Sequence, residues 1–280
     1  MLTALKSVAL MIDETQYASQ IGIQAAEIAH AHSAHLIGVY YVSPSSELVK
    51  SSYARGTQAI ADVIEKLRRE HEEKALAASR HLERLGQQYG ISIEFRVVLG
   101  TRDAQETAAV HALHSDLVIT GHPFGQRSLT EERLLRAAGT PILITPEDWA
   151  GPHTGRRIVL AWNGSREARR AIGDAMPFVQ MAEWVKVLIV DADRDAARHG
   201  SDPGVDLARY LARHNARVEV ESIASGDSTV ANAIASYAKH SGADLLVIGA
   251  YSHARASQVL FGGVTRTLLS SITLPLLVSQ

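Results

Sequence analysis

Short apolar runs alternate with longer segments of helical periodicity along the whole chain, and this alternation occurs twice. The runs are nearly continuous in hydrophobic residues, which is typical of strands that are covered by helices on both faces. Each repeat therefore predicts five buried strands. The runs lie at 7–13, 35–42, 94–100, 115–121 and 140–145 in the first repeat, and at 157–163, 184–192, 219–226, 243–249 and 274–279 in the second.

Strands that alternate with helices favour parallel sheets built from right-handed crossovers. The sequence therefore predicts an α/β protein with two tandem, open, parallel five-stranded sheets in a doubly wound arrangement. The segment 147–156 is rich in Gly, Pro and polar residues and predicts a linker. We expect one domain at 1–147 and a second at 156–280.

A long charged segment distinguishes the first repeat from the second, and the closing runs of the two repeats predict how they pair. The first repeat carries a charged segment at 59–89 with Leu and Ile at helical spacing, which predicts one long amphipathic helix. The closing runs at 140–145 and 274–279 are short and apolar, and exposed sheet edges seek partners. We expect these two runs to pair, which would make the chain an intramolecular pseudo-dimer. A homodimer of the whole chain stays open.

The composition excludes several classes of function. The formal net charge is -2, so no basic excess favours nucleic acid as a partner. Cysteine is absent, which excludes disulfides, thiolate catalysis and thiolate zinc sites. No stretch has the roughly 18 apolar residues of a membrane span, and the first residues lack the pattern of a signal peptide. We expect a cytoplasmic protein without a membrane partner.

The candidate binding site is a Gly-rich segment after the fourth strand of the second repeat. Gly249 stands at the end of that strand, and ligands in open parallel sheets bind beyond the carboxyl ends of strands. Gly262 and Gly263 come directly before a helical run that begins near Val264. Glycines let main-chain N–H groups approach an anion, and a helix N-terminus adds N–H donors and a positive dipole end. Two glycines before a helix also form simple turns; the position after the fourth strand adds support for phosphate binding, and both interpretations stay open.

This layout resembles the universal stress protein family in its tandem two-domain form. Nucleotide-binding members of that family carry the motif G-x2-G-x9-G-[ST] after the fourth strand. Gly249, Ser252, Gly262 and Gly263 stand at the matching positions with the spacing intact. Ser252 replaces a glycine and Gly263 replaces Ser or Thr, so Thr265 is a candidate to supply the missing hydroxyl.

The resemblance implies a fold like that of the adenine-nucleotide α-hydrolases and a regulatory role in the stress response. The implied ligand is ATP or another adenine nucleotide in the second repeat, with Mg²⁺ as its companion, although no dedicated carboxylate ligand is evident. The family also has an Asp near the ribose at the end of the first strand, and Asn163 stands there in the second repeat. Main-chain groups near Ala161, Val190 and Ile248 would frame the base and ribose, and Gly249, Ser252, Gly262, Gly263 and Val264 would hold the phosphates.

The first repeat departs further from the family pattern. The segment from Gly121 to Pro141 is six residues shorter than the segment from Gly249 to Pro275, and no paired glycine precedes its helix. Two glutamates, 131 and 132, stand at the start of that helix instead and would repel a phosphate. The first repeat thus keeps the family's Asp, at position 13, without the loop.

Catalytic chemistry has little support in the sequence. No general base is positioned at the loop, so we expect at most slow ATP hydrolysis, and whether the protein is an enzyme stays open. Ser165 predicts a helix cap rather than a nucleophile. An adenylating enzyme would need a catalytic base or a Lys at the loop, and the segment 249–269 has no Lys, Asp or Glu. The alternative function is a protein-interaction module that binds no nucleotide and uses the helix at 59–89 to contact an unknown protein.

Overall fold

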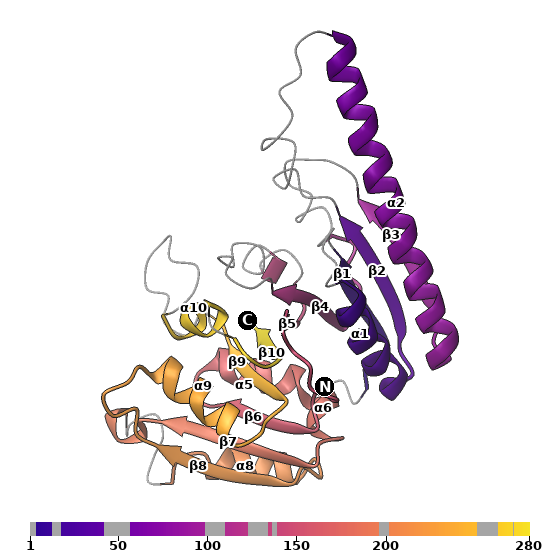
Figure 1. Cartoon of the computed structure of the whole chain (residues 1–280). Coiled ribbons are helices and arrows are strands. Elements are labelled where there is room, and N and C mark those ends of the chain that lie inside the picture. The colour runs from indigo at the N-terminus through magenta and orange to yellow at the C-terminus, as the bar shows by residue number, and fades with distance from the viewer. Residues whose placement is uncertain are drawn as a thin grey trace. The chain divides into compact units, whose positions relative to one another are not determined.

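The structure is a computed structural model, and contacts divide it into two compact units. One unit comprises residues 6–121, and the other comprises residues 1–5 with 122–280. Figure 1 shows the elements of each unit. The residues that the structure describes are 4–12, 18–41, 57–98, 110–122, 134–135, 139–195, 202–250, 263–270 and 272–280.

The unit of residues 6–121 contains a parallel sheet with the strand order β3-β2-β1-β4. Strand β1 lies inside this sheet, between β2 and β4, and Val8 to Ile12 are all buried. Residues 7–12 of the predicted apolar run therefore form a buried strand, as predicted. The strands are β1 (Ser7–Ile12), β2 (His35–Tyr41), β3 (Ile93–Val98) and β4 (Leu117–His122).

Two helices, α1 (Ala18–His32) and α2 (Thr57–Tyr89), pack on each other and on this sheet. The predicted long helix is confirmed as α2, which has 33 residues. Its carboxyl half fits closely on β2, because a Cβ on Gly38 would lie 2.3 Å from a methyl group of Leu82. The amino half of α2 extends past the ends of the strands (Figure 1).

The unit of residues 122–280 has the strand order β5-β10-β9-β6-β7-β8. All neighbours are parallel except β5 and β10, which are antiparallel and align Ile144 with Leu276. The predicted pairing of the two closing runs is thus confirmed. Its contacts assign β5 to the same unit as β10. The predicted domain limits, 1–147 and 156–280, stay a prediction. The strands are β5 (Ile142–Pro146), β6 (Arg157–Ala161), β7 (Trp184–Val190), β8 (Val218–Ile223), β9 (Leu245–Gly249) and β10 (Leu276–Ser279).

Helices lie on both faces of this sheet, as the doubly wound arrangement requires. Helices α9 and α10 contact each other on one face, and α5 and α8 lie behind the sheet in Figure 1. The helical segment after β6 is divided into two helices, and Pro177 lies at the start of the short second one. The helices are α5 (Arg166–Asp174), α6 (Met176–Val179), α8 (Val205–Ala212), α9 (Val230–His240) and α10 (Gly263–Ser270), with a 3₁₀ turn η1 (Ala192–Asp195).

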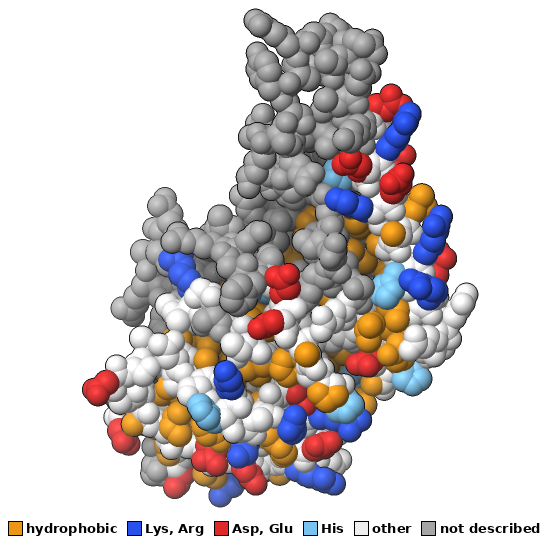
Figure 2. Space-filling view, viewed as in Figure 1, with side chains coloured by type: hydrophobic (Ala, Val, Ile, Leu, Met, Phe, Trp, Pro, Cys, Tyr) orange, Lys and Arg blue, Asp and Glu red, His pale blue; other side chains and the backbone are white. Residues whose placement is uncertain are grey.

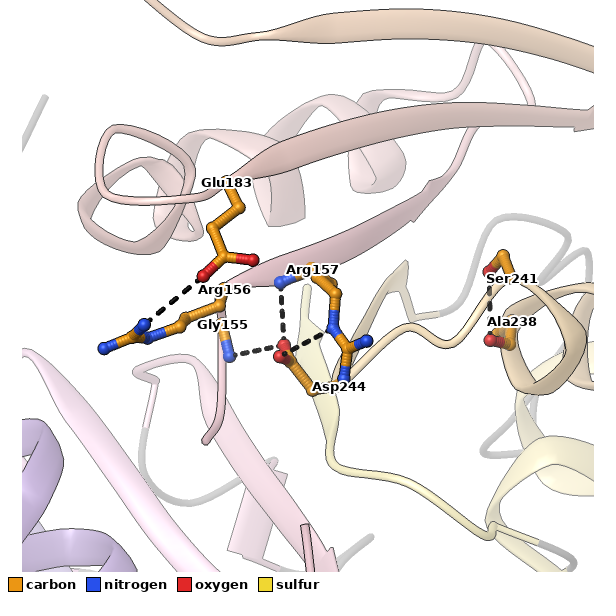
Figure 3. Close-up of polar contacts among 7 residues, drawn as sticks. All are labelled: Gly155, Arg156, Arg157, Glu183, Ala238, Ser241 and Asp244. Carbon is orange, nitrogen blue, oxygen red and sulfur yellow. Dashed lines mark hydrogen bonds and ion pairs between the residues drawn. The ribbon is translucent and has the colours of Figure 1, made fainter. Parts of the chain in front are cut away.

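One carboxylate joins two strands at the amino edge of each repeat. Asp244 precedes β9, is 3% exposed, and accepts main-chain N–H groups of Gly155 and Arg157 at 2.9 Å each (Figure 3). Asp116 precedes β4 and accepts the N–H groups of Lys6 and Ser7 at 2.7 and 3.0 Å. Both carboxylates hold the start of a repeat's first strand against its fourth strand.

Burial disfavours the charged form of the Asp244 carboxyl group. It raises the pKa of this carboxyl, and the N–H groups of Arg157 and Gly155 and the guanidinium of Arg157 work against that rise. The neighbouring pair Arg156–Glu183, at 3.3 Å, is exposed and adds little.

Candidate functional site

The strand order of the second repeat reverses between β6 and β9. From β6 the chain proceeds outward through β7 and β8, then returns to β9 on the other side of β6. In an open parallel sheet the crevice at such a reversal, outside the carboxyl ends of the strands, is where ligands bind. The register places Leu160 beside Val247, so Ala161 and Ile248 follow at this edge.

The predicted site residues that the structure describes lie at this edge. Helix α10 connects the parallel neighbours β9 and β10, so it runs back along the sheet and its first turn lies where β9 ends. Ser252 and Gly262 lie outside the described residues, and so does Asp13 of the first repeat. Ala161 is the last residue of β6, and Asn163 lies two residues beyond it. Val190 is the last residue of β7, and Ile248 and Gly249 end β9. Gly263, Val264 and Thr265 form the start of α10.

The turn between β6 and α5 is organised by two polar side chains. The Asn163 side-chain oxygen accepts the N–H of Ser165 at 3.1 Å, and the Ser165 hydroxyl accepts the N–H of Ala168 at 3.1 Å. Ser165 is therefore the N-cap of α5, as its position predicted. Asn163 shapes this turn at the edge where the family's Asp would stand.

The two predicted glycines that the structure describes have different surroundings. A Cβ on Gly249 would lie 2.4 Å from the main-chain N of Ala168, because the first turn of α5 packs directly on the end of β9. Packing alone thus requires glycine at 249. A Cβ on Gly263 would meet no described atom within 4 Å. Packing against the described residues therefore does not require glycine at 263.

The first turns of α5 and α10 differ in what they offer an anion. The first turn of α5 has its own cap at Ser165 and a carboxylate at Glu167. The first turn of α10 has no acidic residue. Gly263 and Val264 are exposed there, whereas Thr265 is only 4% exposed. An anion is therefore more favourable at α10, where main-chain N–H groups are the available donors.

Sequence reasoning missed one polar contact at this edge, which we call the Asp191–Ser225 clamp. The Asp191 carboxylate accepts the N–H of Ser225 at 2.8 Å and the Ser225 hydroxyl at 2.7 Å, and Arg194 adds an ion pair at 2.9 Å. The pKa of Asp191 is lowered, first by the Ser225 N–H, then by the Ser225 hydroxyl, and also by the charge of Arg194. Its signal in the sequence is a carboxylate at a position where the first repeat has Val42.

The charged side chains that the structure describes form no single-sign patch on the face in Figure 2. Acidic and basic side chains are interspersed over the described part of the face in Figure 2. Among the described residues, no group of three or more His, Asp or Glu side chains is arranged to hold a metal ion. Within the same part of the chain, no helix combines the length and apolar character that a bilayer crossing requires.

Comparison with known families gives a match over the second repeat. Residues 155–280 match the model of the universal stress protein family. The second repeat is a universal stress protein domain. Its carboxyl edge, with the Gly-rich segment after β9, is the edge that the family resemblance singled out.

Solved structures extend the likeness to both repeats. A universal stress protein from Archaeoglobus fulgidus DSM 4304 matches with a TM-score of 0.71 and 15% identity, covering 98% of each chain. A putative universal stress protein from Pseudomonas aeruginosa UCBPP-PA14 matches with a TM-score of 0.60 and 18% identity, covering 99% of this chain and 94% of its own. The whole chain therefore shares the fold of these two structures. No curated protein matches the chain.

Proposed function

We propose that this protein is a stress-response regulator that binds ATP or another adenine nucleotide at the carboxyl edge of its second repeat. The observation that carries the proposal is the position of the start of α10. The first turn of α10 follows the Gly-rich segment, contains no acidic residue, and exposes Gly263 and Val264. It lies beyond the carboxyl end of β9, beside the strand reversal. Main-chain N–H groups at such a helix start suit phosphate oxygens.

The other predicted residues fit the remaining parts of the ligand. The carboxyl ends of β6, β7 and β9 supply main-chain groups near Ala161, Val190 and Ile248. The base and ribose of a bound nucleotide would lie against these groups. Because Thr265 is buried, the main-chain donors of Gly263 and Val264 are the better candidates for phosphate contacts. Mg²⁺ would be held chiefly by the phosphates, and any hydrolysis would be slow because the proposal includes no general base.

The test begins with the purified full-length chain. Protein that is denatured and filtered is expected to release an adenine nucleotide, detected by absorbance and chromatography, and ligand-free protein is expected to melt at a higher temperature when ATP and Mg²⁺ are added. Replacing Gly262 with Val should remove both signals, because a branched side chain would stand among the main-chain donors. Ser128→Val, in the shorter segment between Gly121 and Pro141 of the first repeat, is the control and should change neither.

A second candidate function is an interaction module that binds no nucleotide. The departures at Ser252, Gly263 and Asn163 favour it, because each replaces a residue that nucleotide-binding members of the family carry. This candidate predicts no released nucleotide and no thermal shift with ATP. Normal ATP binding by Gly262→Val would show instead that nucleotide binds elsewhere.

A further inference from the structure

The end of β7 has an unusual main-chain conformation. Asp191 follows Val190 directly and has φ of +55°, in the left-handed region that Asp tolerates better than most residues. Its N–H donates to the carbonyl of Ile223 at 2.9 Å, and its carbonyl accepts the N–H of Arg194 at 3.0 Å. The chain therefore turns sharply just after Val190, and the conformation of Asp191 decides where the adjacent peptide groups point.

The Asp191 side chain is largely engaged by its neighbours. It is 8% exposed, and its two oxygens already accept three donors, from Ser225 and Arg194. A carboxylate in this state has little capacity left to accept a hydrogen bond from a ligand. Any role it has in binding must act through the main chain that it holds in place.

The first repeat lacks the residues for this contact. The parallel registers align Tyr41 with Val98 in the first repeat and Val190 with Ile223 in the second. When this alignment is continued along the sequence, Val42 of the first repeat corresponds to Asp191 of the second, and Gly100 corresponds to Ser225. Neither Val nor Gly has a polar side chain, so the clamp belongs only to the repeat that has the Gly-rich segment.

We propose that Asp191 is a positioning residue for nucleotide recognition: the Asp191–Ser225 clamp fixes the peptide groups after Val190 so that they read the edge of the base. This inference rests on the proposed function of the second repeat. Main-chain groups distinguish adenine from guanine only if they are held in one orientation, because the two bases differ in the donors and acceptors along one edge. The clamp supplies that constraint at the end of β7.

The experiment measures dissociation constants of the full-length chain for ATP, GTP and inorganic triphosphate by calorimetry, together with melting temperatures. Asp191→Ala should weaken ATP binding about tenfold, within the usual range for coupled sites, and reduce the preference for ATP over GTP. Ser225→Ala removes only the hydroxyl and should act in the same direction, but less. Asp193→Ala, which removes an exposed neighbouring charge, is the matched control and should change nothing.

Triphosphate affinity separates positioning from general damage. The inference requires that triphosphate binding stays unchanged in Asp191→Ala while ATP affinity falls. Equal losses for ATP and triphosphate, or an unchanged ATP-to-GTP ratio, would overturn it. If Asp191→Ala does not fold, the same comparison with Ser225→Ala decides. Failure of the wild-type chain to bind ATP would overturn the proposed function as well, whereas wild-type binding with unaffected variants would overturn the clamp alone.

Discussion

The two repeats are alike at the amino edges of their sheets and different at the carboxyl edges. At the amino edge, Asp116 and Asp244 occupy matching positions, and each accepts two main-chain N–H groups at the start of the repeat's first strand. At the carboxyl edge, only the second repeat has the Gly-rich segment and the residues of the Asp191–Ser225 clamp. The shared contacts build the fold, and so the differing ones are where function is to be sought.

This comparison also explains why fold likeness extends over both repeats while the family match covers one. The Archaeoglobus fulgidus and Pseudomonas aeruginosa structures match 98% and 99% of the chain, and the family model matches residues 155–280. Strand order and crossovers are set by hydrophobic pattern, which both repeats retain. Residues that hold a ligand are few, and a repeat can lose them without losing its fold.

The largest effect expected is on stability, from removal of the amino-edge carboxylates. Asp244→Ala leaves a buried N–H group, a part-buried N–H group and a guanidinium without their acceptor, and should lower the free energy of unfolding by about 3 kcal/mol. Asp116→Ala should cost about 1 kcal/mol, because that contact is more exposed. Urea denaturation measures both. A larger loss of unfolding free energy for Asp116→Ala than for Asp244→Ala would contradict the conclusion that the Asp244 contact matters more for stability.

A smaller effect separates the two glycines at the candidate site. Gly249→Ala would place a methyl group against the main chain of α5 and should destabilise the protein by about 2 kcal/mol. Gly263→Ala meets no described atom, and should change stability by less than about 1 kcal/mol. Thermal unfolding of both variants is the measurement. A large loss for Gly263→Ala would mean that Gly263 serves packing rather than access.

The smallest effect expected is the pH dependence of the clamp. Because hydrogen bonds from Ser225 lower the pKa of Asp191 in the folded state, its stabilising contribution is present above the ordinary Asp value, about 3.9. It is lost as the pH falls through the lowered value. The stability difference between wild type and Asp191→Asn should be constant at neutral pH and shrink below about pH 4. A difference that grows on acidification would contradict the sign of this shift.

Hydrophobic pattern predicts the elements and their pairing well. The alternation of strands and helices, the long helix α2 and the β5–β10 pair all follow from runs of apolar residues. It was less informative where one residue interrupts a pattern. The break between α5 and α6 depends on Pro177, and the end of β7 depends on the left-handed Asp191, inside the run predicted as a strand to 192.

The site was predicted only as far as it follows from strand ends. Ala161, Val190, Ile248 and Gly249 lie at the carboxyl edge because the sheet is parallel and its order reverses there. The clamp joins residues 34 positions apart through a side chain, and no periodicity reports such a contact. The packing reason for Gly249 likewise depends on a helix that approaches from elsewhere in the chain.

Hydrogen exchange of the full-length chain with and without ATP and Mg²⁺ tests most directly whether the second repeat alone holds the nucleotide. The account predicts slower exchange of main-chain amides at 161–165, 190–192, 248–250 and 263–265 when ATP is present. It predicts no change in the matching strands of the first repeat, at 7–12 and 117–122. Protection in the first repeat, or none at these positions of the second, would contradict it.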